Sequence, residues 1–279
     1  MEAEFCSESK EGGPVMDEKI SRESRIVQQL RLMDDDFMRA CLRDNIPGVQ
    51  LILRIILQKP KLVVQKMETQ KDIKNLKGRS LCFDVWAKSD DEIYNIEIER
   101  TDGRASPKRA RYHSSMLDAD VSEPGEKLEN LVETFVVFIT EKDIFRKGHP
   151  TYHYDRYCQE TGNKLNDGAH IIFVNGQYEG DDDMGNLMND FRCTNASEMV
   201  YTELAERVRH LKEREEGETN MCRLIEEYGN ERAQEGRIEG ENRFSTLVTK
   251  LKELGREDDA FKAAADPDFR NQLYQQYNL

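Results

Sequence analysis

The chain has no apolar run long enough to cross a bilayer. Its longest candidate, residues 49–57, contains Gln50 and Arg54 and is far shorter than the roughly 20 apolar residues of a membrane helix. The N-terminus is acidic and lacks the basic and then apolar pattern of a secretory leader. These absences predict a soluble, cytoplasmic protein that does not interact with a membrane.

Paired cysteines and metal-type histidine spacings are also missing. The cysteines form no CxxC pair, and the histidines form no HExxH pattern. We therefore expect no zinc site, and we expect packed or free thiols in a reducing cytoplasm. The cysteines are Cys6, Cys41, Cys82, Cys158, Cys193 and Cys222, and the histidines are His113, His149, His153, His170 and His210.

Positive charge is in deficit. The chain has 41 Lys and Arg residues against 55 Asp and Glu residues, which gives a formal net charge of −14. Phosphate backbones repel such a protein unless it presents a local basic face or bridging cations. Any nucleic-acid partner must therefore bind through a local feature.

The most informative segment that is present is residues 81–99, which we call the acidic hairpin. A turn at Asp90-Asp91 pairs its two strands so that partner numbers sum to about 181, which places Asp84 across from Glu97 and Glu99 two residues further along. Alternation puts these three carboxylates on one face and Phe83 and its apolar neighbours on the other. Opposed like charges cost up to about 1 kcal/mol. A divalent cation would relieve that cost.

Two interpretations of the acidic hairpin remain open. Polar alternation is common on solvated strands, so Glu97 and Glu99 alone indicate little. Asp84, however, lies between Phe83 and Val85 in a strand context that disfavours aspartate. The metal-site hypothesis makes Asp84 and Glu97 ligands of Mg²⁺ or Mn²⁺, with Glu99 as a further ligand or as the base that accepts a proton from water.

A cluster of cations follows the acidic hairpin directly. These side chains would contact a phosphate backbone beside the metal, form ion pairs with the acids, or belong to an ordinary solvated face. The sequence does not separate the three alternatives. The candidate nucleic-acid-binding residues are Arg100, Arg104, Lys108, Arg109 and Arg111.

The order of predicted elements is α/β. Helical spacing begins at Ile26 and continues through a second apolar helix over residues 49–57, and a first strand is predicted over residues 61–70. Ser106 followed by Pro107 marks a helix start, with Ala110, His113 and Met116 or Leu117 on the inner stripe. Apolar runs predict strands over residues 134–140 and 170–174. A mixed sheet flanked by helices follows.

Three regions are expected along the chain: a disordered leader over residues 1–24, an α/β domain over residues 25–194, and a helical C-terminal tail over residues 195–279. Gly229, Gly236 and Gly240 are expected to interrupt the tail. Leu247, Leu251 and Leu254 then predict a short amphipathic helix. The tail either packs on the domain or forms a contact between copies, which would make the protein a homo-oligomer.

The acidic hairpin resembles the core motif of the PD-(D/E)XK nuclease superfamily. More narrowly, the chain is similar to its bacterial recombination-promoting nuclease/putative transposase group. The resemblance spans about residues 30–225. It is carried by segments such as LMDDDFMRAC (32–41) and LKGRSLCFDVWAKSDDEIYNIEIER (76–100), and by residues 108–120, 134–148, 169–178 and 189–201.

This resemblance implies a restriction-endonuclease-like core and Mg²⁺-dependent cleavage of DNA. Asp84 matches the motif aspartate and Glu97 the motif acid, both as metal ligands. Position 99 departs from the pattern, because the superfamily has lysine there and this group usually glutamine. Lys108 or Arg109 is the candidate substitute for that cation, or else Glu99 recruits a second metal ion. Asp36 matches an acid of the first helix that approaches the site in some members.

The leading hypothesis is a Mg²⁺-dependent DNA endonuclease that cleaves by metal-activated water and acts in recombination or with mobile elements. The alternative is a catalytically impaired protein of the same fold that binds nucleic acid or protein. Glu99 and the net charge of −14 motivate this alternative.

Overall fold

The computed structural model describes residues 24–75, 78–100, 105–122, 125, 127–277 and 279. The chain forms two compact units, Met1–Cys222 and Arg223–Leu279. The expected leader over residues 1–24 lies outside the described residues except for Ser24. Among the described helices, none is long and apolar enough to cross a membrane.

The first unit is built on a mixed sheet of six strands within the described residues, in the order β1-β2-β3-β4-β6-β5. Neighbours β3, β4 and β6 are parallel, and the other pairs are antiparallel. The predicted α/β class with a mixed sheet is confirmed. The strands are β1 (Lys66–Ile73), β2 (Leu81–Lys88), β3 (Glu92–Glu99), β4 (Glu133–Thr140), β5 (Thr151–Tyr154) and β6 (Ala169–Asn175).

The predicted register of the acidic hairpin is confirmed for the four pairs next to the turn. Val85 pairs with Ile96 and Lys88 with Ile93, so the partner numbers sum to 181. The turn is closed by the Ser89 N–H, which donates to the Glu92 carbonyl at 2.9 Å. A short turn fixes strand register, which is why this feature follows from sequence alone.

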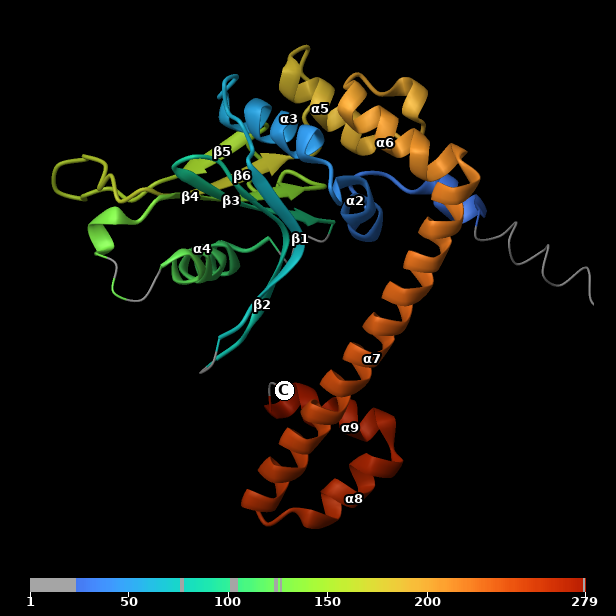
Figure 1. Cartoon of the computed structure of the whole chain (residues 1–279). Coiled ribbons are helices and arrows are strands. Elements are labelled where there is room, and N and C mark those ends of the chain that lie inside the picture. Colours follow the sequence, from blue (N-terminus) through green and yellow to red (C-terminus); the bar gives the residue numbers. More distant parts are fainter. Residues whose placement is uncertain (1–23, 76–77, 101–104, 123–124, 126, 278) are drawn as a thin grey trace, which may run out of the picture. The chain divides into compact units, whose positions relative to one another are not determined.

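Helices cover both faces of the sheet (Figure 1). Helix α4 (Pro107–Val121) packs on β4 and β6, and α3 (Ile46–Leu57) with α5 (Asp183–Arg192) lies over the opposite face. The apolar run of β4 is buried at seven of eight positions, as expected for a central strand. The rings of Phe138 and Phe173 stack in the core with centroids 5.6 Å apart.

Helix α4 begins as the sequence predicts. Ser106 Oγ accepts a hydrogen bond from the Arg109 N–H at 3.2 Å, and Pro107 occupies the first turn. Ala110, His113 and Leu117 form a buried stripe. The cap fixes where Arg109 lies, one turn into the helix.

Two elements of the first unit were not predicted. The edge strand β5 has only four residues, too few for a period-two pattern, and α5 begins at an Asp182 cap in a strongly polar segment. The first strand also begins later than expected, at Lys66.

Helix α6 (Thr202–Glu213) packs on α2 (Asp35–Leu42) and α3. Lys212 is buried, and its Nζ donates to the Gln28 carbonyl at 3.0 Å and to those of Leu30 and Thr194 at 2.5 Å. Helix α6 therefore belongs to the first unit, which differs from the expected division at residue 195.

The second unit is a small helical bundle. It contains the end of α7 (Glu215–Glu253), α8 (Glu257–Ala265) and α9 (Pro267–Tyr277). Leu247 and Leu251 are buried against Ala263, Leu273 and Tyr274. Helix α7 runs without a break through the three glycines, so the expected interruption is wrong. A glycine costs about 1 kcal/mol relative to alanine, which weakens a helix without ending it.

Candidate active site

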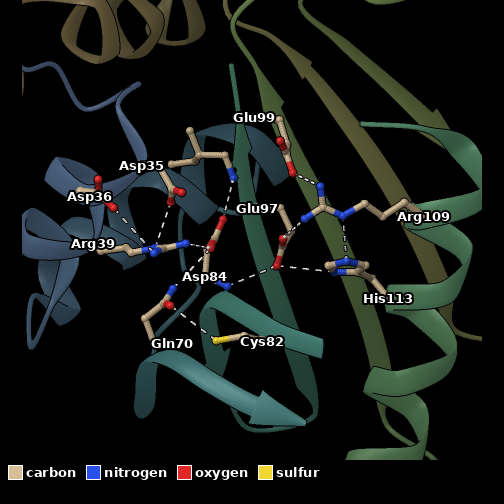
Figure 2. Close-up of polar contacts among 11 residues, drawn as sticks. Asp35, Asp36, Arg39, Gln70, Cys82, Asp84, Glu97, Glu99, Arg109 and His113 are labelled. Carbon is tan, nitrogen blue, oxygen red and sulfur yellow. Dashed lines mark hydrogen bonds and ion pairs between the residues drawn. The ribbon is translucent and has the colours of Figure 1, made fainter. Parts of the chain in front are cut away.

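The carboxylates of the acidic hairpin lie where β2 and β3 separate. The backbone pairing of β2 with β3 ends at Val85 and Ile96. Beyond this pair, the two strands are joined by hydrogen bonds between side chains and backbone amides. The Asp84 N–H donates to Glu97 Oε1 at 3.2 Å, and the Ile98 N–H donates to Asp84 Oδ2 at 3.2 Å. Each carboxylate thus binds the backbone of the opposite strand (Figure 2). The two acids are fixed by the fork between the strands.

The neighbouring strand β1 has an irregular residue at the same level. Gln70 has a left-handed φ of +56°, between the pairs Thr69–Val85 and Lys71–Phe83. Its Nε2 donates to Asp84 Oδ1 at 3.4 Å. Phe83 packs in the same core as Trp86, although strict alternation would place them on opposite faces. The predicted alternation therefore does not hold through Asp84.

Among the cations that the structure describes, Arg109 of α4 lies nearest to the two glutamates. Its Nη2 lies 3.2 Å from Glu97 Oε2, and its Nη1 forms an ion pair with Glu99. Glu97 is 1% exposed and the Arg109 side chain about one third exposed. One guanidinium therefore links two carboxylates from one side, as Figure 2 shows.

His113, one turn further along α4, orients Arg109. Arg109 Nε donates to His113 Nε2 at 3.2 Å. Burial and the adjacent Arg109 charge lower the pKa of His113 to about 4, so the ring is neutral at pH 7. The other ring nitrogen, Nδ1, lies 3.0 Å from Asn95 Nδ2 and 3.5 Å from Glu97 Oε1.

A second arginine approaches from the opposite direction. Arg39 Nη2 of α2 lies 3.2 Å from Asp84 Oδ1, and Nε lies 2.9 Å from Asp35 Oδ1. Asp36 was the predicted acid of the first helix, and its Oδ1 lies 3.8 Å from Arg39 Nη1. The first helix thus reaches Asp84 through Arg39 (Figure 2).

Burial favours the protonated form of both central acids. It raises the pKa of Asp84 to about 7, with the Glu97 and Asp35 charges adding to the effect and Arg39 opposing it. It raises the pKa of Glu97 to about 8, although Arg109 and the Asp84 N–H act in the opposite direction. The pair is therefore short of positive charge even with two arginines beside it.

The donor chemistry fits a hard divalent cation, although the geometry is not that of a preformed metal centre. Within the described ranges, no group of three or more His, Cys, Asp or Glu side chains is arranged to hold a metal ion. Asp84 and Glu97 supply carboxylate oxygens, which Mg²⁺ prefers. The oxygens that do not bind backbone amides contact Arg39 and Arg109.

The structure separates the five predicted cations. Only Arg109 joins the carboxylates among those the structure describes. Arg100 lies 2.7 Å from Asp34 and 3.6 Å from Glu141, whereas Lys108 and Arg111 are exposed on α4. Arg104 lies outside the described residues.

Sequence reasoning missed two members of this site. Arg39 follows Asp35 by four residues and Asp36 by three, which is a helical ion-pair spacing and the one available signal. His113 was expected only as a packing residue, although it follows Arg109 by four residues, the spacing at which helical side chains are neighbours.

Comparison of the chain with family models, curated proteins and solved structures gives no match.

Proposed function

We propose that the protein is a Mg²⁺- or Mn²⁺-dependent DNA endonuclease with a restriction-endonuclease-like core. The observation that carries this proposal is the fork between β2 and β3, which brings Asp84 and Glu97 together with Glu99 beside them. Asp84 and Glu97 would hold the metal. When bound, the ion neutralises charge on the phosphate and lowers the pKa of a water molecule.

Arg109 supports this proposal as the substitute for the missing motif lysine. Of the two candidates on α4, Arg109 contacts Glu97 and Glu99, whereas Lys108 is exposed. A guanidinium does not act as a base at neutral pH, but it binds two phosphate oxygens at once. Arg109 would orient the scissile phosphate, and Glu99 would accept the proton from water.

The exposed cations next to the site would hold the DNA backbone. Lys108 and Arg111 are exposed on α4, and Arg100 is about half exposed at the end of β3. Contacts of this kind position a duplex without selecting its sequence. They also supply the local positive charge that a chain of net charge −14 requires.

Nicking of supercoiled plasmid in Mg²⁺ or Mn²⁺ tests the proposal. The wild type should convert the plasmid to the open circle, and Asp84→Asn should reduce the rate by at least about 100-fold, because the metal loses a charged ligand. Asp91→Asn is the matched control, since it changes an exposed aspartate in the turn of the same hairpin. An inactive wild type, or full activity in Asp84→Asn, contradicts the proposal.

A second candidate is a protein of this fold that binds nucleic acid without cleaving it. It is favoured by Arg39 and Arg109, which form ion pairs with the carboxylate oxygens that a metal ion would otherwise take. In that case the wild type binds but does not nick DNA, and Asp84→Asn binds equally well. The double substitution Lys108→Ser with Arg111→Ser should weaken binding by about 10-fold or more at low salt under either candidate.

A further inference from the structure

The second unit has an apolar groove on its surface, between α7 and α8. The groove has a volume of about 280 Å³, and five of its seven lining residues are apolar. Phe261, on one wall, is 76% exposed. An exposed aromatic ring beside an open apolar groove is unusual for a surface that faces only water.

The residues of α7 and α8 that line the groove can be paired by their distance from the turn between the two helices. Residues four apart on a helix are separated by about 6 Å along its axis. The turn at residues 254–256 reverses the chain, so α8 runs in the opposite sense to the end of α7 (Figure 1). Lys252 and Glu257 therefore lie at the level of the turn.

Further from the turn, each wall places one larger residue opposite a smaller one. Val248 of α7 lies near the level of Phe261 of α8, and Phe244 of α7 near the level of Ala264. The larger residue is thus on α8 at one level and on α7 at the next.

We propose that this groove is the contact between two copies of the chain, related by a two-fold axis along the groove. A rotation about this axis leaves the position of each residue along the groove unchanged, and it places α7 of one copy opposite α8 of the other. Phe261 then faces Val248 of the partner subunit, and Phe244 faces Ala264 of the partner subunit. Lys252 faces Glu257 of the partner subunit, so opposite charges meet at the rim.

Charge and shape identify the occupant as a second copy. Within the described part of the chain, no ion pair joins Lys252 or Glu257 to another residue, so both are available across an interface. An aromatic side chain buries about 150–250 Å² when it is covered. Leu247 and Leu251 of the predicted amphipathic helix are buried inside the bundle and are not part of this surface.

The contact should dissociate on dilution. The groove is lined by seven residues, whereas a stable interface has about 20–30 on each side. Sedimentation of the full-length chain over a range of concentrations should therefore show a monomer–dimer equilibrium.

Charge exchange tests the arrangement directly. Lys252→Glu alone and Glu257→Lys alone should each weaken the dimer by at least about 10-fold, because like charges then meet across the axis. The double variant Lys252→Glu with Glu257→Lys should recover the wild-type dimer. A wild type that is monomeric at all concentrations, or a double variant that does not recover, overturns the proposal.

Phe261→Ser provides the independent test. It should give a monomer with an unchanged far-ultraviolet spectrum, because a side chain that is 76% exposed contributes little to folding. Leu254→Ser is its control, since Leu254 is 51% exposed but lies outside the groove, and it should remain dimeric. A dimer that survives Phe261→Ser places the contact elsewhere and overturns the proposal. The oligomeric state measured in these experiments does not depend on nuclease activity.

Discussion

The three carboxylates of the acidic hairpin are stable in the folded protein only because positively charged residues lie next to them. Three carboxylates converge from two strands, and the compensating arginines come from two helices, α2 and α4. Hydrogen bonds to the Asp84 and Ile98 amides supply further partial positive charge. The site is therefore built from acids that the hairpin supplies and cations that the tertiary fold brings to it.

Removing Arg109 should be costly. Arg109→Ala leaves Glu97 buried beside Glu99 without its nearest cation, and breaking a buried ion pair costs about 3 kcal/mol. Because Arg109 is about one third exposed, we expect a loss of about 2 kcal/mol in the free energy of unfolding by urea at pH 8. Lys108→Ala, an exposed neighbour, should change it by less than about 0.5 kcal/mol. Equal effects of the two substitutions would contradict this account.

Stability should fall as pH rises when chelator keeps divalent cations away. The pKa of Glu97 is about 8 in the folded protein and about 4.3 in an unfolded chain. The folded state thus binds the extra proton, and its stability is complete below about pH 4.3 and is lost as pH rises to about 8. Urea unfolding at pH 6 and pH 8.5 measures the difference. Glu97→Gln should reduce the difference without abolishing it, because burial also raises the pKa of Asp84 to about 7, whereas Asp91→Asn should leave it unchanged.

At the scale of elements, the position of α4 sets the position of Arg109. Ser106 accepts the Arg109 N–H, so the cap that starts the helix also fixes the backbone of this arginine. Helix α2 places Arg39 beside Asp84. The candidate active site thus lies where α2 and α4 meet the separating ends of β2 and β3.

Loss of the α4 cap should therefore affect stability and activity together. Ser106→Ala should lower the free energy of unfolding by about 1 kcal/mol. It should also reduce plasmid nicking, because Arg109 loses its fixed anchor. Ser106→Thr keeps the hydroxyl and should retain both properties. If Ser106→Ala loses stability but keeps the full nicking rate, the cap does not position Arg109 for catalysis.

The sequence predicts local features of these elements well and their tertiary contacts poorly. The hairpin register and the Ser106 cap follow from turn and capping chemistry, which act within a few residues. The irregular Gln70 is supplied by another strand, and Arg39 lies 45 residues from Asp84, so neither contact has a local signal. Arg109 was a candidate cation, but only the packing of α4 decides between Arg109 and Lys108.

At the scale of the whole molecule, the chain divides after Cys222, and α6 is part of the sheet-containing unit. Contacts across long sequence separations hold it there. Arg207 Nη2 donates to the Ala40 and Arg43 carbonyls, and Lys212 donates to three more.

Truncation should show this division. A chain ending at residue 222 should retain cooperative unfolding by urea. A chain ending at residue 194 should be destabilised strongly, because it exposes the surface that α6 covers on α2 and α3. Circular dichroism of both fragments measures the outcome, and similar unfolding midpoints for the two would place the boundary before α6.

The separate origin of acids and cations also has a consequence for the order of folding. Until α2 and α4 have docked, the carboxylates of Asp84, Glu97 and Glu99 repel one another. The contacts between β2 and β3 at this end of the hairpin should therefore form late in folding. Substitutions of Arg39 or Arg109 should then accelerate unfolding and leave the folding rate nearly unchanged, with φ-values near 0. The turn end, closed by Ser89 and Glu92, needs neither helix and is free to form early.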